Sequence, residues 1–107
     1  MATRALVHLP AVLRRGEAFE VRATLQHPME TGYRRDSDGR MLPRDIVRRF
    51  EARLGTELVF AADCFPAIAA NPYLAFWLRL DEGGTLELRW TGDRGFQHVE
   101  TVAIALA

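Results

Sequence analysis

The sequence predicts an all-β fold, an immunoglobulin-like antiparallel β-sandwich. Six or seven short apolar segments are separated by turn signals, and the clearest of them alternates between apolar and polar residues. The chain of 107 residues is long enough for one domain with a hydrophobic core and too short for two. We therefore expect a single domain over residues 1–107.

The composition excludes several classes of protein. Apolar residues make up 49% of the chain, and 14 basic residues balance 14 acidic ones. This balance argues against a nucleic-acid-binding surface or a polybasic membrane anchor. A single cysteine, Cys64, excludes an internal disulfide. Arg4 and Pro10 leave too short an apolar run for a signal peptide, and no stretch reaches transmembrane length, so we expect neither feature.

Two N-terminal segments carry strand patterns. Residues 4–9 place Ala5, Val7 and Leu9 on one face of a short strand. Residues 19–25 alternate between apolar and polar side chains, which is the period of a strand with one buried and one solvated face. The residues of this second strand that we expect in the core are Phe19, Val21, Ala23 and Leu25.

The apolar periodicity stops in residues 27–44, where Pro, Gly, Asp and Arg take over. Pro28 favours an extended conformation at His27, because the proline ring clashes with an α-helical residue before it. Gly32 permits positive φ, and Asp38-Gly39 is a tight-turn signal. A long loop with this much backbone specification is either an ordered functional element or a crossover that only joins two sheets.

Residues 45–55 fit two structures. A helix would begin at Asp45, end at Gly55 and carry an apolar face made of Ile46, Val47, Phe50 and Leu54. A strand would turn inward Ile46, Phe50, Ala52 and Leu54, and a hairpin at Gly55-Thr56 would lead into a strand over residues 58–62. Periodicity alone slightly favours the helix.

The C-terminal half contains three further strand patterns. Breaks at Cys64-Phe65-Pro66 and Asn71-Pro72 precede residues 73–80, which are apolar on both faces. The second face of this strand, made of Tyr73, Ala75 and Trp77, needs a cover, which a second sheet, the 27–44 loop or a partner would supply. Turns at residues 83–84 and 92–95 separate the last strands, whose inward residues are Leu86, Leu88, Trp90, Val102, Ile104 and Leu106.

The polar residues form no recognisable catalytic, cofactor or metal motif. His8, His27 and His98 are scattered, so no pair has the spacing of metal ligands on a strand or a helix. Cys64 fits a small buried side chain better than a nucleophile, because no spacing links it to a histidine. We therefore expect no metal site and no cofactor.

Arginines gather around the central loop. They outnumber the acidic residues Asp36, Asp38, Asp45 and Glu51 of the same region. The surplus either attracts an anionic group or forms a solvated, partly paired surface, which is the commoner meaning of such a run. The arginines are Arg34, Arg35, Arg40, Arg44, Arg48, Arg49 and Arg53.

Four short blocks stand out: HPMETG at residues 27–32, RRD at 34–36, PRDI at 43–46 and ANPY at 70–73. In content, order and spacing they resemble the SoxZ family of the bacterial sulfur-oxidising (Sox) system. The resemblance covers nearly the whole chain and extends to GTLELRWTGDRG at residues 84–95. It implies an immunoglobulin-like sandwich in which the PRDI block opens a strand, so residues 45–55 are expected to be a strand.

The resemblance also implies a non-catalytic role. SoxZ proteins pair with SoxY, whose C-terminal glycine-rich segment bears the cysteine that carries thiosulfate-derived sulfur between the Sox enzymes of the periplasm. This chain ends ETVAIALA, without glycine or cysteine, so it resembles the subunit that lacks the cysteine-bearing segment. We expect it to reach the periplasm together with a signal-bearing partner. A generic β-sandwich module that binds protein or carbohydrate is the alternative.

We expect contacts with the SoxY-like partner, or with docking Sox enzymes, from the quoted blocks and from the doubly apolar strand. The residues are His27, Met29, Glu30, Arg34, Arg35, Asn71, Tyr73 and Trp77. No nucleic acid or membrane is expected among the partners.

Overall fold

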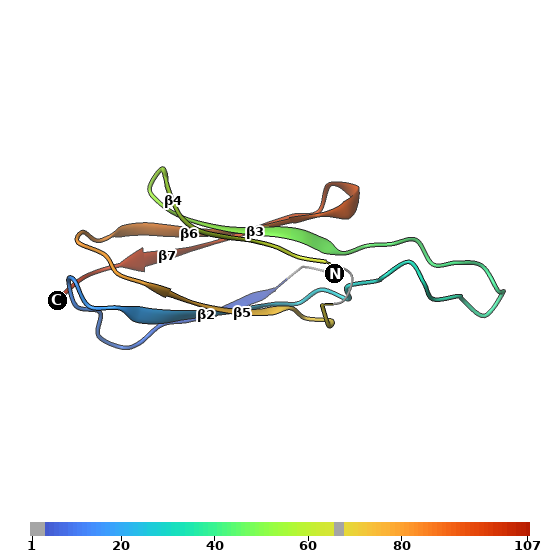
Figure 1. The fold of residues 1–107 in the computed structure, drawn as a ribbon, viewed down its shortest axis with the longest axis horizontal. Helices are drawn as coiled ribbons and strands as arrows, with labels where there is room; N and C mark the ends of the chain where they lie inside the picture. Colours follow the sequence, from blue (N-terminus) through green and yellow to red (C-terminus); the bar gives the residue numbers. More distant parts are fainter. Residues whose placement is uncertain (1–3, 66–67) are drawn as a thin grey trace.

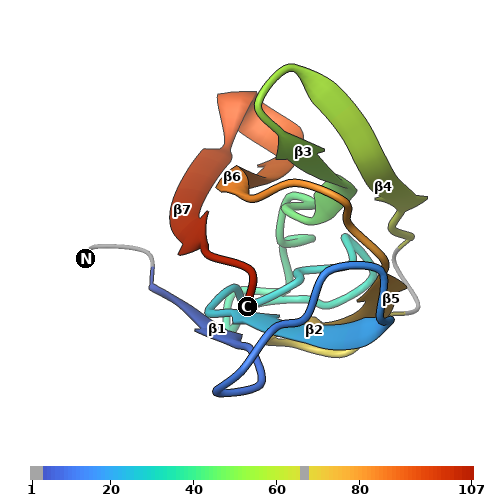
Figure 2. The same ribbon diagram turned by 90° about the vertical axis from the view of Figure 1, so that its left-hand side faces the viewer.

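Two antiparallel sheets face each other in a sandwich, which confirms the predicted fold class (Figures 1 and 2). The computed structural model describes residues 4–65 and 68–107; Pro66, one of the predicted chain breaks, lies outside them. One sheet has the order β1-β2-β5 and the other the order β4-β3-β6-β7. Within the described residues, no helix is long and apolar enough to span a membrane.

The smaller sheet is built on the strand with the clearest alternation. β2 (Phe19–Leu25) pairs with β1 (Ala5–His8) on one side and with β5 (Tyr73–Leu78) on the other. Every second residue of β2 is buried, because successive side chains of a strand point to opposite faces. β5 is an edge strand of this sheet.

The larger sheet consists of two hairpins that pair with each other along one strand of each. β3 (Val47–Leu54) pairs with β4 (Glu57–Asp63) through the turn at Gly55-Thr56, and with β6 (Gly84–Gly92) on its other side. A short 3₁₀ turn, η1 (Asp93–Gly95), connects β6 to β7 (Gln97–Ile104). The strand that follows the PRDI block is thus β3, and the helix that periodicity favoured for these residues is wrong.

The core lies between the two sheets and is centred on Phe50 of β3. Its ring centroid lies 5.7 Å from that of Phe76 and 5.0 Å from that of Trp90, so aromatic contacts join β3 to β5 across the sandwich. Phe60 of β4 stacks on Phe76 at 4.4 Å. The inward residues predicted for β2 and β6 are buried as expected, whereas Val102 and Leu106, also predicted to face inward, are only partly buried.

A β-bulge interrupts β3 where it begins. Val47 is opposite Gly92 and Arg49 is opposite Thr91, so Arg48 is an extra residue on the β3 side. Gly92 allows the strands to approach here, because a Cβ on it would lie 2.4 Å from the carbonyl oxygen of Ile46. Ile46 and Val47 are both buried, whereas Arg48 faces solvent.

The segment between β2 and β3 crosses from one sheet to the other and also projects from the end of the sandwich (Figure 1). We call residues 30–45 the arm. Bridges between Glu30 and Asp45 and between Arg35 and Met41 hold its two halves together, and Gly39 with φ of 81° lies at its tip. The molecule therefore measures 57 × 23 × 22 Å. The segment is therefore an ordered crossover between the two sheets.

Candidate functional site

The predicted contact residues fall into three places: the base of the arm, the arm itself and the outer face of the smaller sheet. His27 and Met29 are buried at the base, with 4% exposure each. The Nδ1 atom of His27 accepts a hydrogen bond from the Met29 N–H at 3.0 Å, and the ring lies edge-on to Phe96. These two side chains therefore position the arm and offer no surface for direct contact with a partner.

His27 is held as a neutral ring. Burial lowers its pKa, although the nearby carboxylates of Asp45 and Asp93 oppose this effect. The neutral form fits the geometry, because Nδ1 can accept the Met29 N–H only when it carries no proton. Nε2 faces the Asp45 carboxylate at 3.8 Å.

Asn71 links the base of the arm to β5, the strand that begins at Tyr73. Its side-chain oxygen accepts a hydrogen bond from the His27 N–H at 3.0 Å, and its own N–H donates to the His27 carbonyl at 2.7 Å. Asn71 has positive φ, 54°, which asparagine tolerates better than most residues. The HPMETG and ANPY blocks, far apart in the sequence, therefore meet at this point.

The arm presents charged and aromatic side chains to solvent. The Arg34 guanidinium binds Glu30, and this hydrogen bond is the main reason why the pKa of Glu30 is lowered. Arg35 donates to the Gly39 carbonyl at 2.8 Å and so closes the tip. Tyr33 is 79% exposed and has its backbone N–H bound to the Thr31 hydroxyl.

The outer face of the smaller sheet carries exposed apolar side chains. Tyr73 and Trp77 of β5 are 58% and 65% exposed, and Leu6 of β1 is 70% exposed. Neither the second sheet nor the arm covers β5 on this face, so two of the covers considered for it are excluded. Leu6 and Tyr73 both pair with Thr24 of β2, so the three form one row across the sheet. Leu6 was not among the predicted contact residues, although the alternation in residues 4–9 already turned it outward.

The cysteine and the buried histidine lie in surroundings that do not suit a nucleophile. Cys64 is buried, and desolvation raises the pKa of its thiol. The ring nitrogens of His27 face Met29 and Asp45, so they do not activate a thiol. In residues 4–65 and 68–107, no three His, Cys, Asp or Glu side chains are grouped to hold a metal ion.

Comparison with known proteins identifies the family. The family model of sulphur oxidation protein SoxZ matches residues 7–103. The chain belongs to the SoxZ family. Membership in the SoxZ family places it in the sulfur-oxidation system. No curated protein sequence matches it.

Solved structures resemble this SoxZ-family chain in fold alone. The superoxide reductase (neelaredoxin) of Ignicoccus hospitalis is 16% identical, with a TM-score of 0.71 over 98% of this chain and 82% of that chain. A putative superoxide reductase of Thermotoga maritima is 11% identical, with a TM-score of 0.70 over 96% of this chain and 85% of that chain. A hypothetical protein of Pyrococcus horikoshii is 11% identical, with a TM-score of 0.58 over 94% of this chain and 85% of that chain. At these identities the likeness concerns the sandwich and not the chemistry of its loops.

Proposed function

We propose that this chain is a non-catalytic subunit that pairs with a SoxY-type carrier protein. The pair carries thiosulfate-derived sulfur intermediates, bound covalently to the SoxY cysteine, between the Sox enzymes of the periplasm. The observation that carries this proposal is the SoxZ family match over residues 7–103. The buried Cys64 thiol, whose pKa is raised, supports the non-catalytic part, because the thiolate is the reactive form of cysteine.

The outer face of the smaller sheet is the proposed interface with the SoxY-type subunit. Trp77 and Tyr73 lie on an edge strand and expose large aromatic surfaces to water, which is costly unless a partner covers them. Aromatic side chains are enriched among the residues that dominate binding energy. Obligate pairs commonly bury about 2,000 Å² or more, so Leu6, Arg22 and Glu20 would also enter the interface.

The arm is the proposed contact with Sox enzymes that act on the carrier. It projects beyond the sandwich, away from the outer face of the smaller sheet, so both surfaces can be occupied together (Figure 1). Its charged residues, the exposed Arg34 and Arg35 and the half-buried Glu30 that pairs with Arg34, suit transient contacts in which electrostatics governs the rate of association. His27, Met29 and Asn71 hold the arm at its base.

Co-expression with a SoxY-type chain tests the pairing. Wild type and Trp77→Ala are compared, with Tyr33→Ala as a matched control, because Tyr33 is also an exposed aromatic residue but lies on the arm. We expect Trp77→Ala to weaken co-purification and Tyr33→Ala to preserve it. The reverse pattern would move the interface to the arm, and failure of the wild type to bind would refute the proposed function.

A further inference from the structure

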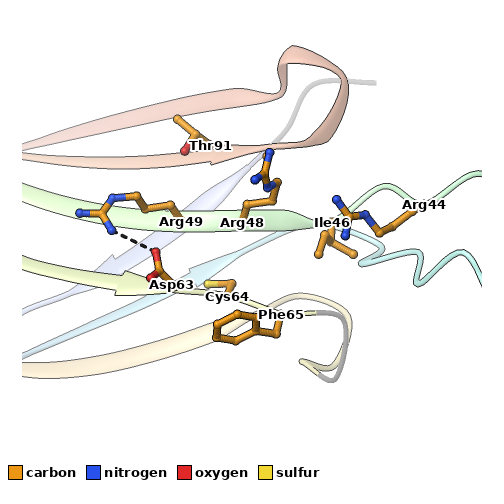
Figure 3. Close-up of a pocket in the computed structure, with 9 residues that line it drawn as sticks. Arg44, Ile46, Arg48, Arg49, Asp63, Cys64, Phe65 and Thr91 are labelled. Carbon is orange, nitrogen blue, oxygen red and sulfur yellow. Dashed lines mark hydrogen bonds and ion pairs between the residues drawn. The ribbon is translucent and has the colours of Figure 1, made fainter.

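A cavity of about 650 Å³ lies on the larger sheet, next to the last residues of the arm and apart from the proposed interface on the smaller sheet. It is formed where β3 begins, β4 ends and β6 ends (Figure 3). Arg44 and Arg48 lie at one end of it, and Arg49 extends along β3 toward Asp63. Its other walls are made of Ile46, Cys64, Phe65, Thr91 and Gly92.

The β-bulge explains why two consecutive arginines line the same cavity. In a regular strand Arg48 and Arg49 would point to opposite faces of the sheet. The extra residue at Arg48 changes this alternation, so both guanidinium groups reach the outer face while Val47 and Phe50 stay in the core. Bulges often turn a side chain toward a functional site in this way.

The cavity carries an excess of positive charge. Three guanidinium groups and one carboxylate, that of Asp63, line it. Asp93 holds Arg44 through two hydrogen bonds of 2.9 Å, and Asp63 holds Arg49 through one of 3.0 Å. Arg48 forms no ion pair with any residue that the structure describes, although its charge helps to lower the pKa of the nearby Asp93, and the Nη1 atom of Arg44 has no acceptor in this part of the chain. N–H groups of Arg48 and Arg44 can therefore donate hydrogen bonds to an anion.

The remaining walls tolerate an anion. The Cys64 thiol is neutral, because burial raises its pKa, so no thiolate repels a negative charge. Thr91 adds a hydroxyl that can donate a hydrogen bond. Ile46 and Phe65 provide apolar surface beside the arginines.

We propose that this cavity binds a small tetrahedral oxyanion of the sulfate or sulfonate class, with Arg48 and Arg44 as its main donors. Guanidinium groups match such anions through paired N–H donors. Two sources share this chemistry: a free ion such as sulfate or thiosulfate, and a sulfonate group at the end of a sulfur chain attached to a carrier cysteine. The second source rests on the proposed function, and the first does not.

Titrations of the isolated chain test the site. Backbone amide signals are followed by NMR at low ionic strength as sodium sulfate, sodium thiosulfate or S-sulfocysteine is added. We expect saturable shifts at Arg48, Cys64 and Thr91, and affinity that falls as sodium chloride is raised. Tighter binding of S-sulfocysteine would assign the tethered source, whereas tighter binding of a free ion would assign the other.

Matched variants complete the test. Arg48→Gln should weaken binding about tenfold, as expected when one charge-assisted contact is lost. Arg53→Gln is the control, because Arg53 lies on the same strand, pairs with Glu51 and does not line the cavity. Arg44→Gln is the second variant, should Arg48→Gln alter the fold.

Absence of saturable shifts, or equal losses in Arg48→Gln and Arg53→Gln, would overturn the site. Co-purification of Arg48→Gln with a SoxY-type chain is measured in parallel and should be unchanged. Failure of the oxyanion site is therefore distinguishable from failure of the proposed pairing.

Discussion

The backbone N–H of Val47 donates a hydrogen bond to the sulfur of Met29 at 3.2 Å, which joins the base of the arm to the first residue of β3. Met29 has 4% exposure and belongs to the core. The loop residue expected on a docking surface is therefore a structural anchor, and its removal is expected to affect stability directly.

Met29→Ala should lower the free energy of unfolding by about 2–5 kcal/mol, as buried Met-to-Ala truncations do. Met41→Ala is the control, because Met41 lies on the arm and is 47% exposed. Chemical denaturation of the two variants measures the difference. Equal stabilities would show that Met29 does not anchor the arm.

Leu25→Ala and Leu88→Ala should each lower the free energy of unfolding by about 2–5 kcal/mol, because both side chains are fully buried. Arg22→Ala, on the solvent face of the same strand as Leu25, should leave it nearly unchanged. Thermal melts of the isolated chain distinguish these outcomes. A loss of stability in Arg22→Ala as large as that in Leu25→Ala would show that the register assigned to β2 is wrong.

His27→Gln should remove a pH dependence of stability. Folding lowers the pKa of His27, so between its ordinary value of about 6.5 and its lower folded value the unfolded chain binds more protons. The free energy of unfolding of the wild type should therefore fall as pH drops through this window. Gln retains an acceptor for the Met29 N–H but does not titrate. Denaturation curves measured from pH 7.5 to 5 give the free energy of unfolding of the wild type and of His27→Gln. The same pH dependence in both proteins would contradict the role of His27.

Cys64→Ser should lower the free energy of unfolding by about 1–3 kcal/mol, because it buries a hydroxyl where a thiol packs, and should leave sulfur transfer intact. The native thiol should also react slowly with a thiol reagent at pH 8, because burial raises its pKa and restricts access. Rapid labelling of the folded protein, or loss of transfer by a folded Cys64→Ser protein, would contradict a structural thiol.

Strand positions and the inward faces of β2 and β6 were predictable from alternation, because one buried face imposes a period of two. Residues 45–55 were ambiguous for a local reason. The bulge at Arg48 turns Val47 inward with Phe50, and Ile46 just before the strand is also buried, so the spacing of these three residues imitates a helical face. Only the family resemblance favoured the strand.

The candidate site was less predictable than the fold. Sequence patterns singled out His27 and Met29, but their burial depends on packing against Phe96 and Val47, which are distant in the chain. The cavity beside Cys64 depends on the bulge and on Gly92, neither of which leaves a periodic signal. Tyr73 and Trp77 were correctly recognised as a second apolar face, but alternation says nothing about what covers it.

Co-purification with a SoxY-type chain, combined with thermal melts, tests the central claim most directly. We expect the wild-type chain to form a stable complex and to melt at a higher temperature in it, because a partner that binds only the folded state stabilises it. Trp77→Ala should melt like the wild type when alone, since its side chain is exposed, but should lose about 2 kcal/mol or more of pairing energy. A wild-type chain that neither co-purifies with nor is stabilised by any SoxY-type partner would contradict the account.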